Sequence, residues 1–419
     1  MAILRLAWKS LLNRRMTAAL TLLSIALSVA LLIGVERVRV DARESFANTI
    51  SGTDLIVGAR SGGVQMLLYS VFRIGNATNN ISWKSYQDIA ALPSVAWSIP
   101  MSLGDSHQGY RVLGTTQDYF THYRYARDRG LVFDQGRPFD DLYDAVLGAE
   151  VARALGYQLN DPIVIAHGAG DVSFTRHEDK PFRVAGILER TGTPVDRTVH
   201  VSLEAIEAVH IDWQSGAQIP GLSVSAEQAR QRDLTPGVIT AALVGLNSKL
   251  ATFRVQRFVN DYTEEPLTAV LPGVALSELW GIIGIAENAL LIVSAFVVVV
   301  GLFGMLTVLL TSLNERRREM SILRSVGARP GHVFALIMGE AVALTLAGIA
   351  LGIGLIYSLL LIAGPIVEAR YGIYIAPGGL SSREFLLLVI VLLAGFLVVM
   401  FPGYRAYRLS LADGLSILV

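Results

Sequence analysis

The sequence predicts a membrane protein with four transmembrane α-helices and one large α+β domain outside the membrane. Four apolar runs are each long enough to cross a bilayer, for which about 20 residues suffice. Between the first and second runs no other segment has that length, and patterns of short strands and helices alternate there. Arginine clusters border the runs on one side, which identifies that side as cytoplasmic.

The composition agrees with this organisation. Of the 419 residues, 52% are hydrophobic and 17% are charged, and the net charge is zero. A few membrane helices combined with an aqueous domain produce such values. The chain has no cysteine, so we expect neither a disulfide nor cysteine chemistry. Without a net positive charge or a basic run outside the membrane flanks, nucleic-acid binding has no support.

The N-terminal region predicts a surface helix followed by the first membrane span. Residues 1–16 place apolar side chains on one face and Arg5 and Lys9 on the other, which is typical of an amphipathic helix at the cytoplasmic interface. Residues 17–35 carry no charge and form the predicted transmembrane helix 1. A cleaved signal peptide is the alternative, but the run is long and no small-residue cleavage site follows it.

Residues 36–279 form the predicted extracytoplasmic domain. A period-two apolar pattern predicts a strand at Phe182–Leu188, and Gly156 is the expected C-cap of a short helix. The apolar segment Val64–Ile74 predicts either a helix in the domain core, which we favour, or an amphipathic piece that contacts lipid or an amphiphilic substrate. Residues 212–236 show the weakest pattern, and we expect an inserted loop or a boundary between lobes.

Residues 280–313 predict transmembrane helix 2 with an outer extension. The run is longer than one crossing requires and contains a single charge, Glu287. We prefer projection beyond the bilayer to a steep tilt, since projection places Glu287 at the outer interface, whereas a charge in hydrocarbon costs at least about 2.5 kcal/mol.

Residues 314–331 predict a short cytoplasmic helix that could insert an apolar ridge into a groove of a partner while its charged rim forms ion pairs. Gly327 followed by Pro330 predicts the end of this helix. The alternative is a basic juxtamembrane helix whose positive charges only set the orientation of the chain in the membrane. The candidate docking residues are Glu315, Arg316, Arg317, Arg318, Glu319, Met320, Ile322, Leu323, Arg324, Val326 and Gly327.

The last third of the chain predicts two further spans. Transmembrane helix 3 covers 332–363 and has Gly348 and Gly352 at the small-x-x-x-small spacing that lets helices approach closely. It also contains the acid Glu340, for which a proton or substrate site and a structural ion pair are the alternatives. An outer loop at 364–383, transmembrane helix 4 at 384–401 and a cytoplasmic tail at 402–419 complete the prediction.

Several stretches resemble one family, the FtsX/MacB-like (type VII) permeases of ABC transporters. These are Asn314–Ala328, the N-terminal run with Asn13, Arg14 and Arg15, the order of elements in the outer domain, Met338–Ala341 with the later glycines, and the ending Pro402–Leu415. The resemblance implies an outer domain of the MacB periplasmic-core type. For Glu340 it favours the structural role, a pair with the arginine cluster.

The resemblance also implies a function. The layout is nearest to lipoprotein-release-type permeases without a fused ATPase, and no Gly-Lys dipeptide is present to form a phosphate-binding loop. We therefore expect a separate cytoplasmic ATPase that binds ATP and magnesium, a permease dimer, and mechanical action on a lipoprotein, lipid or peptide. A periplasmic or outer-membrane protein is a further expected partner. The expected location is the inner membrane, with both termini cytoplasmic.

Two other classes of function remain as alternatives. An FtsX-like regulator would activate a periplasmic partner, such as a cell-wall hydrolase, without transport. A membrane enzyme would need a clustered acid, base or nucleophile, and no such motif is evident, so we expect no catalytic residue in this chain. The seven histidines show no metal-binding spacing, so we expect no metal site.

Overall fold

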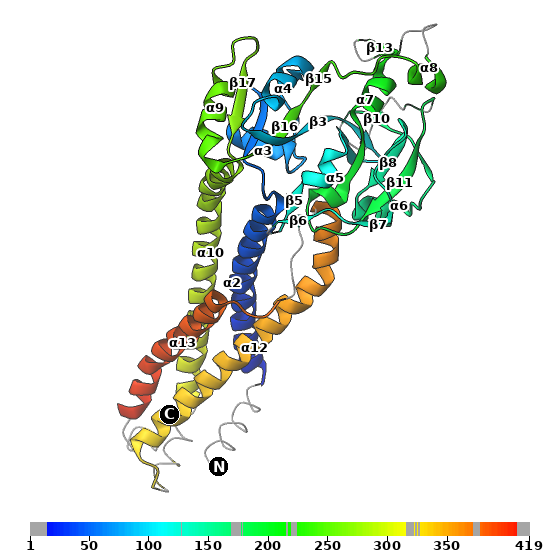
Figure 1. Cartoon of the computed structure of the whole chain (residues 1–419). Coiled ribbons are helices and arrows are strands. Elements are labelled where there is room, and N and C mark those ends of the chain that lie inside the picture. The colour runs from blue at the N-terminus through cyan, green and yellow to red at the C-terminus, as the bar shows by residue number, and fades with distance from the viewer. Residues whose placement is uncertain are drawn as a thin grey trace. The chain divides into compact units, whose positions relative to one another are not determined.

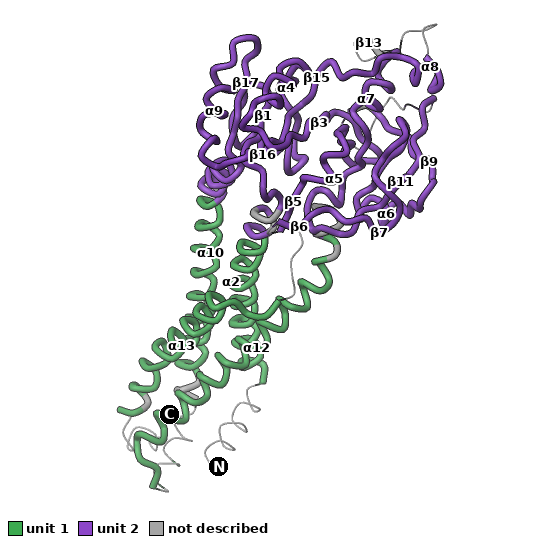
Figure 2. The backbone as a smooth tube through the Cα atoms, viewed as in Figure 1, with its two compact units in different colours: residues 1–41, 284–366, 375–419 green, residues 42–283, 367–374 purple. Residues whose placement is uncertain are grey.

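The computed structural model describes residues 15–126, 128–168, 177, 179–214, 217–218, 224–315, 322, 325, 327–371 and 378–408. The chain divides into two compact units, coloured separately in Figure 2. Unit 1 comprises residues 1–41, 284–366 and 375–419, and unit 2 comprises residues 42–283 and 367–374. Residues 1–14 of the predicted amphipathic helix and residues 409–419 of the predicted cytoplasmic tail lie outside the described residues.

Four long helices supply unit 1. They are α2 (Arg15–Thr49), α10 (Pro272–Glu315), α12 (Pro330–Tyr371) and α13 (Ser382–Arg408). Each contains a window long and apolar enough to cross a membrane, with mean hydropathy between 2.4 and 3.0. The helices exceed the spans themselves: α2 continues past Val35, and α12 continues through Gly364 to Tyr371, where we expected a loop. The helix continues because Ile362 and Ile366 extend the apolar pattern of α12 into the segment that we expected to be a loop.

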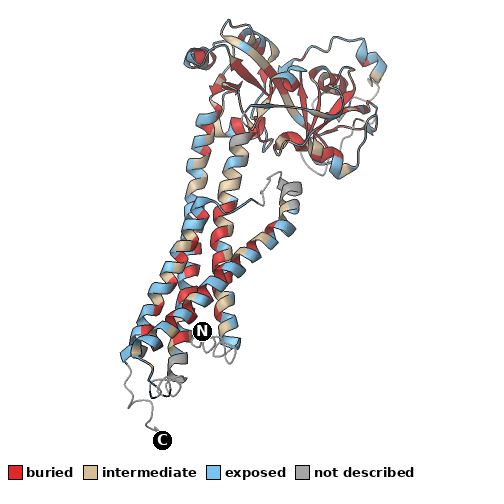
Figure 3. Ribbon diagram, turned by 60° about the horizontal axis from the view of Figure 1, so that its bottom comes forward, coloured by how far each residue is buried: buried red, intermediate tan, exposed pale blue. Residues whose placement is uncertain are grey.

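The core of unit 1 lies between these helices. Buried side chains from all four form one cluster, including Ile33, Met305, Ile337 and Val399. Figure 3 shows the buried residues on the sides of the helices that face one another. Large apolar residues such as Phe296 are exposed on the opposite sides. Apolar residues around the whole circumference are typical of helices that pack inward and meet lipid outward.

Unit 2 is built on a mixed sheet (Figure 1). The strand order is β17-β1-β16-β3-β4-β12-β8-β11-β7. Strand β12 is parallel to β4 and β11 is parallel to β8, and the other pairs along this path are antiparallel. The short strands β9 and β10 pair with β11 and β3. The sheet strands are β1 (Leu55–Ala59), β3 (Val95–His107), β4 (Tyr110–Thr115), β7 (Phe133–Gly136), β8 (Asp144–Leu147), β9 (Pro162–Ile163), β10 (Ala166–His167), β11 (Phe182–Leu188), β12 (Thr198–Ser202), β16 (Ala241–Leu246) and β17 (Leu267–Val270).

Helices cover the sheet. All five residues of β1 are buried, as expected for a strand with both faces covered. The helices of the unit are α3 (Gly63–Ser70), α4 (Trp83–Ala90), α5 (Asp118–His122), α6 (Ala149–Leu155), α7 (Leu203–His210), α8 (Ala226–Arg230) and α9 (Thr252–Asn260), with the 3-10 turns η1 (Pro194–Arg197) and η2 (Lys249–Ala251). Three two-stranded pairs complete it: β2 (Ile81–Ser82) with β15 (Val238–Ile239), β5 (Arg124–Tyr125) with β6 (Arg129–Gly130), and β13 (Trp213–Gln214) with β14 (Ala217–Gln218).

The local sequence signals explain several of these elements. Strand β11 occupies the segment predicted from period-two alternation. Helix α6 ends at Gly156, whose φ of 72° is left-handed, as predicted for a C-cap. Ser225 and Gln228 form a capping box that starts α8, so a helix lies within the segment expected to be an inserted loop.

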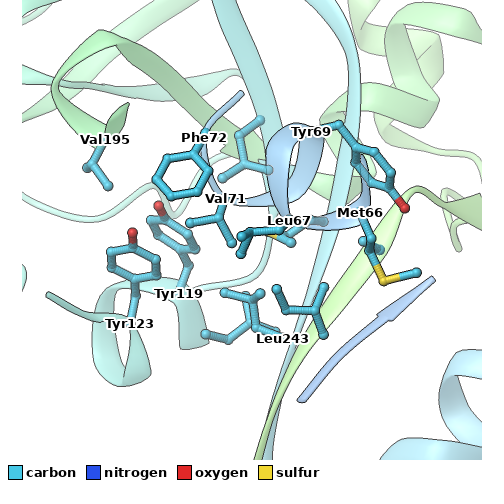
Figure 4. Close-up of a cluster of buried hydrophobic side chains, with 14 of the residues drawn as sticks. Met66, Leu67, Tyr69, Val71, Phe72, Tyr119, Tyr123, Val195 and Leu243 are labelled. Carbon is cyan, nitrogen blue, oxygen red and sulfur yellow. The ribbon is translucent and has the colours of Figure 1, made fainter. Parts of the chain in front are cut away.

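The apolar segment Val64–Ile74 lies largely in the core of unit 2. Its helix α3 and the following turn bury Met66, Leu67, Val71 and Phe72. Figure 4 shows these side chains gathered with Tyr119, Tyr123, Val195 and Leu243. The prediction of a core helix is therefore confirmed.

Candidate functional site

A layer of charged side chains is buried at one end of the helix bundle in unit 1. We call it the charged layer. Glu36 and Arg37 of α2 and Glu384 of α13 are 6% exposed or less. Charges so removed from water are stable only when they are paired and hydrogen-bonded. The members of the layer are Glu36, Arg37, Arg39, Glu287 and Glu384, together with Arg383, whose side chain is 57% exposed at the edge of the layer.

Arg37 connects three elements. Its Nε lies 3.3 Å from Oε1 of Glu384 on α13. Its Nη2 donates to the carbonyl oxygens of Gly378 and Gly379, at 2.8 and 2.7 Å, in the segment before α13. The guanidinium also lies 5.0 Å from the ring centre of Tyr357 on α12, a cation–π arrangement. One side chain of α2 thereby contacts both later membrane helices.

Glu36 connects α2 to α13 by a second route and, through Arg39, to α10. Its carboxylate accepts from Arg39 at 2.8 Å and lies 3.1 Å from Nε of Arg383 on α13. Arg39 in turn lies 3.9 Å from Glu287 of α10. Ser381 and Glu384 cap the start of α13 reciprocally, with backbone to side-chain hydrogen bonds of 2.6 and 3.2 Å. Charge pairs therefore join α2, α10 and α13 in one layer.

Below this layer, small residues bring α2 close to its neighbours. A Cβ added to Gly348 of α12 would lie 2.6 Å from Ile25, and one added to Gly352 would lie 2.7 Å from the carbonyl oxygen of Ala26. Gly301 of α10 would meet the hydroxyl of Ser28 at 2.9 Å. Ser28 also donates to the carbonyl of Val297 at 3.2 Å. Helix α2 thus packs against α12 and α10 at distances that side chains would prevent.

The predicted docking segment is described only in part. Glu315 is the last residue of α10, Ile322 is 53% exposed, and Gly327 has a φ of 102°, as a left-handed cap requires. Ser325 donates to the carbonyl of Ile322 at 2.8 Å. The other predicted docking residues lie outside the described residues: Arg316, Arg317, Arg318, Glu319, Met320, Leu323, Arg324 and Val326.

Glu340, the acid predicted inside transmembrane helix 3, lies on α12. Its side chain is 7% exposed, so the carboxyl group is buried in unit 1. Glu340 takes part in further interactions, as a buried acid must.

The ends of α2 and α10 that belong to unit 2 are packed on each other and on the core. Phe46 of α2 and Trp280 of α10 make an edge contact, with ring centres 5.5 Å apart. Arg43 lies 5.4 Å from the Trp280 ring, and Phe46 lies 4.4 Å from Phe72, next to α3. Residues 42–49 of α2 and 272–283 of α10 are thus packed on the core of unit 2.

Unit 2 also contains buried polar groups outside this region. Lys180 and Asp212, neither exposed, form an ion pair of 2.7 Å. His210 lies 3.4 Å from Asp105, and its pKa is raised: burial lowers it, but the hydrogen bond and charge of Asp105 outweigh burial. Complete burial lowers the pKa of His200 to about 3. Among the described residues, no three His, Asp or Glu side chains are placed to hold a metal ion.

These features define a class of multi-pass membrane protein with a folded domain inserted between its first two helices. The chain belongs to the FtsX/MacB-like permease family of ABC transporters. Residues 18–240 match the MacB-like periplasmic core domain, and residues 291–411 match the FtsX-like permease C-terminal domain. The family predicted from sequence is confirmed, and with it an inner-membrane protein.

The chain is similar to several curated proteins over almost its whole length. It is 24% identical to the macrolide export ATP-binding/permease protein MacB 1 of Yersinia pestis bv. Antiqua, over 99% of this chain and 60% of that protein. It is 23% identical to MacB of Agrobacterium fabrum, with the same coverage. The chain therefore spans about 60% of the length of these relatives.

Two solved structures are also similar to part of the chain. One is the periplasmic region of MacB from Actinobacillus actinomycetemcomitans, with 11% identity, a TM-score of 0.34, and coverage of 55% of this chain and 94% of that one. The other is the extracellular domain of the Gram-positive transporter YknZ, with 11% identity, a TM-score of 0.31, and coverage of 52% and 98%.

Proposed function

We propose that this chain is the permease subunit of an ABC transporter and transmits the work of a cytoplasmic ATPase to its extracytoplasmic domain. One observation carries the proposal: α2 and α10 are continuous helices whose side chains contact each other in unit 1 and again in unit 2. In unit 1, Ser28 contacts α10 and Arg39 approaches Glu287. In unit 2, Phe46 and Trp280 make the equivalent contact. A displacement of either helix would therefore reach the core around α3.

The length of α10 supports this role. Its 44 residues extend about 66 Å at 1.5 Å per residue, roughly twice the thickness of the hydrocarbon. A helix of that length carries motion past the bilayer. Its cytoplasmic end, Glu315, starts the segment to which we assign ATPase docking, residues 315–327. The arginines of that segment support the orientation with both termini in the cytoplasm.

The proposed partners follow from the same arrangement. ATP and magnesium would bind the ATPase subunits, and closure of two ATPases would act on a dimer of permeases. The substrate class we assign is a lipoprotein, lipid or peptide at the outer leaflet. The predicted spans contain few charged residues, too few to line an aqueous channel, and the charges of the charged layer are paired with one another.

The test is purification of the tagged intact chain in mild detergent, followed by mass spectrometry and an ATPase assay. A stoichiometric ATPase with measurable turnover is the expected result. If the chain purifies alone and inactive, the docking assignment is wrong. A cell-wall hydrolase that binds the chain, without any substrate released from the membrane, would instead support the regulator.

A further inference from the structure

A group of cationic and apolar side chains is exposed on helix α9 and the turn η2 of unit 2. We call it the α9 surface. Leu250 is 94% exposed and Phe253 is 71% exposed, values unusual for large apolar side chains, and Phe258 is 43% exposed. The surface comprises Lys249, Leu250, Phe253, Arg254, Arg257 and Phe258.

The α9 surface is exposed because the opposite face of helix α9 packs against the sheet. Val255 and Val259 are buried against the sheet, at 3% and 0% exposure. Gln256 donates to the carbonyl of Ala269 at 3.0 Å, and the side chain of Asn260 accepts from the Ala269 amide at 2.8 Å. These contacts fix α9 to β17, beside which it lies in Figure 1. Rotation that buried Phe253 would break them, so unit 2 itself cannot cover this side chain.

The cations of the surface have no acid partner in the described part of the chain. No salt bridge there includes Lys249, Arg254 or Arg257. Arg254 donates only to the hydroxyl of Ser94, at 3.1 Å. Asp261 follows the helix, and no described ion pair joins it to Arg257. These exposed cations are therefore available to pair with carboxylates of another protein.

Two other occupants fit this surface less well. In a two-fold dimer the same patch would face itself and bring six cations together, which costs energy. A helix that lies in a membrane surface keeps its cations beside a continuous apolar stripe. Here Arg257 follows Phe253 by four positions and Arg254 follows Leu250 by four, so cations share the face with the apolar side chains.

We propose that the α9 surface docks an acidic amphipathic segment of another extracytoplasmic protein. Phe253 and Leu250 would supply the apolar contact, and Arg254 and Arg257 would pair with carboxylates. Exposed aromatic and arginine side chains are the usual anchors of such interfaces. The inference rests on the proposed function only for placing unit 2 outside the cytoplasm.

The test uses the full chain in living cells, with the photo-crosslinking residue p-benzoyl-L-phenylalanine in place of Phe253. We expect a protein adduct whose mapped segment contains Asp or Glu next to apolar residues. In an Arg254→Glu/Arg257→Glu background its yield should fall roughly tenfold, since like charges would then face each other. The same residue at Val132, also exposed in unit 2, is the matched control and should not respond to these substitutions.

The other outcomes overturn the proposal. An adduct with lipid alone would identify a membrane-binding surface. An adduct insensitive to the charge reversal, one mapped to a segment without acids, or no adduct at all would exclude charge-complementary docking. Thermal unfolding of the Arg254→Glu/Arg257→Glu chain, expected to be unchanged, separates loss of docking from loss of fold. The ATPase assay on the wild-type complex tests the proposed function separately.

Discussion

The guanidinium of Arg37 and the carboxylate of Glu384 form an ion pair, 3.3 Å between Nε and Oε1, although they lie on the first and last membrane helices. Both side chains are almost completely buried. The carbonyls of Gly378 and Gly379 satisfy the Nη2 group of the same arginine. Such a pair stabilises a particular arrangement of helices more than it stabilises folding as such, because desolvation offsets much of its Coulombic gain.

Removal of one partner of this pair should be costly. Arg37→Ala would leave the Glu384 carboxylate buried without its cation, and we expect a loss of about 3–5 kcal/mol in the free energy of unfolding. The measurement is the thermal unfolding midpoint of the intact chain in detergent. Arg230→Ala, which removes a solvent-exposed pair with Asp141 in unit 2, is the control and should change stability by about 1 kcal/mol or less.

The double variant Arg37→Met/Glu384→Met tests the cause of that loss. It removes both charges and fills their volume, so most of the stability lost in Arg37→Ala should return. If the double variant were as unstable as Arg37→Ala, the carbonyl contacts of Arg37 would matter more than its charge.

The close approach of α2 and α12 predicts a difference between two neighbouring glycines. Gly352→Leu would place its Cβ 2.7 Å from the Ala26 carbonyl and 2.9 Å from Val29, so we expect a loss of about 1–3 kcal/mol. Gly354→Leu is the matched control, since nothing lies within 4 Å of a Cβ there. Thermal unfolding and size-exclusion profiles in detergent measure both. Equal profiles for the two variants would contradict the packing described for Gly352.

Local patterns in the sequence predicted the membrane helices and several strands and helix caps of unit 2. They could not predict contacts between residues that are far apart in the sequence. Strand β11 and the cap at Gly156 follow from alternation and turn chemistry within a few residues. The capping box of Ser225 and Gln228 is an equally local signal, although we expected a loop in this segment. The charged layer is different, because the pair of Glu36 with Arg383 depends on how α2 and α13 meet. No periodicity in either helix specifies that contact.

The docking assignment predicts a specific loss of partner. Leu323→Asp combined with Arg324→Glu should abolish co-purification of the ATPase, because it replaces an apolar contact and reverses a charge in the proposed dock. Val132→Asp with Arg129→Glu makes the same chemical changes on an exposed part of unit 2 and should leave the ATPase bound. Co-purification yield and ATP turnover are the readouts. An ATPase retained by the first variant would place the dock elsewhere.

His210 predicts a loss of stability as the pH rises above about 6.5. The charge and hydrogen bond of Asp105 raise its pKa in the folded state above the ordinary 6.5, despite burial. A raised folded pKa contributes stability that is complete below about 6.5 and is lost as the pH rises through the folded value. Unfolding of unit 2 in the intact chain, followed by tryptophan fluorescence, should therefore shift to lower temperature over that window. His210→Gln should remove this part of the dependence, and an unchanged slope would contradict the assignment.

His200 predicts the opposite slope on the acid side. Its Nδ1 lies 3.2 Å from the carbonyl oxygen of Val146, and its Nε2 is buried without a partner in the described structure. Burial lowers its pKa to about 3, so between about 6.5 and 3 the unfolded chain binds a proton that the folded chain does not. Stability should fall as the pH decreases, by up to about 1.4 kcal/mol per pH unit from this residue. His200→Leu removes the titrating group and the unpaired nitrogen together, so the variant should melt at a higher temperature relative to wild type at pH 5 than at pH 7. A constant difference between the two at both pH values would show that His200 takes up its proton at the same pH in the folded and the unfolded chain.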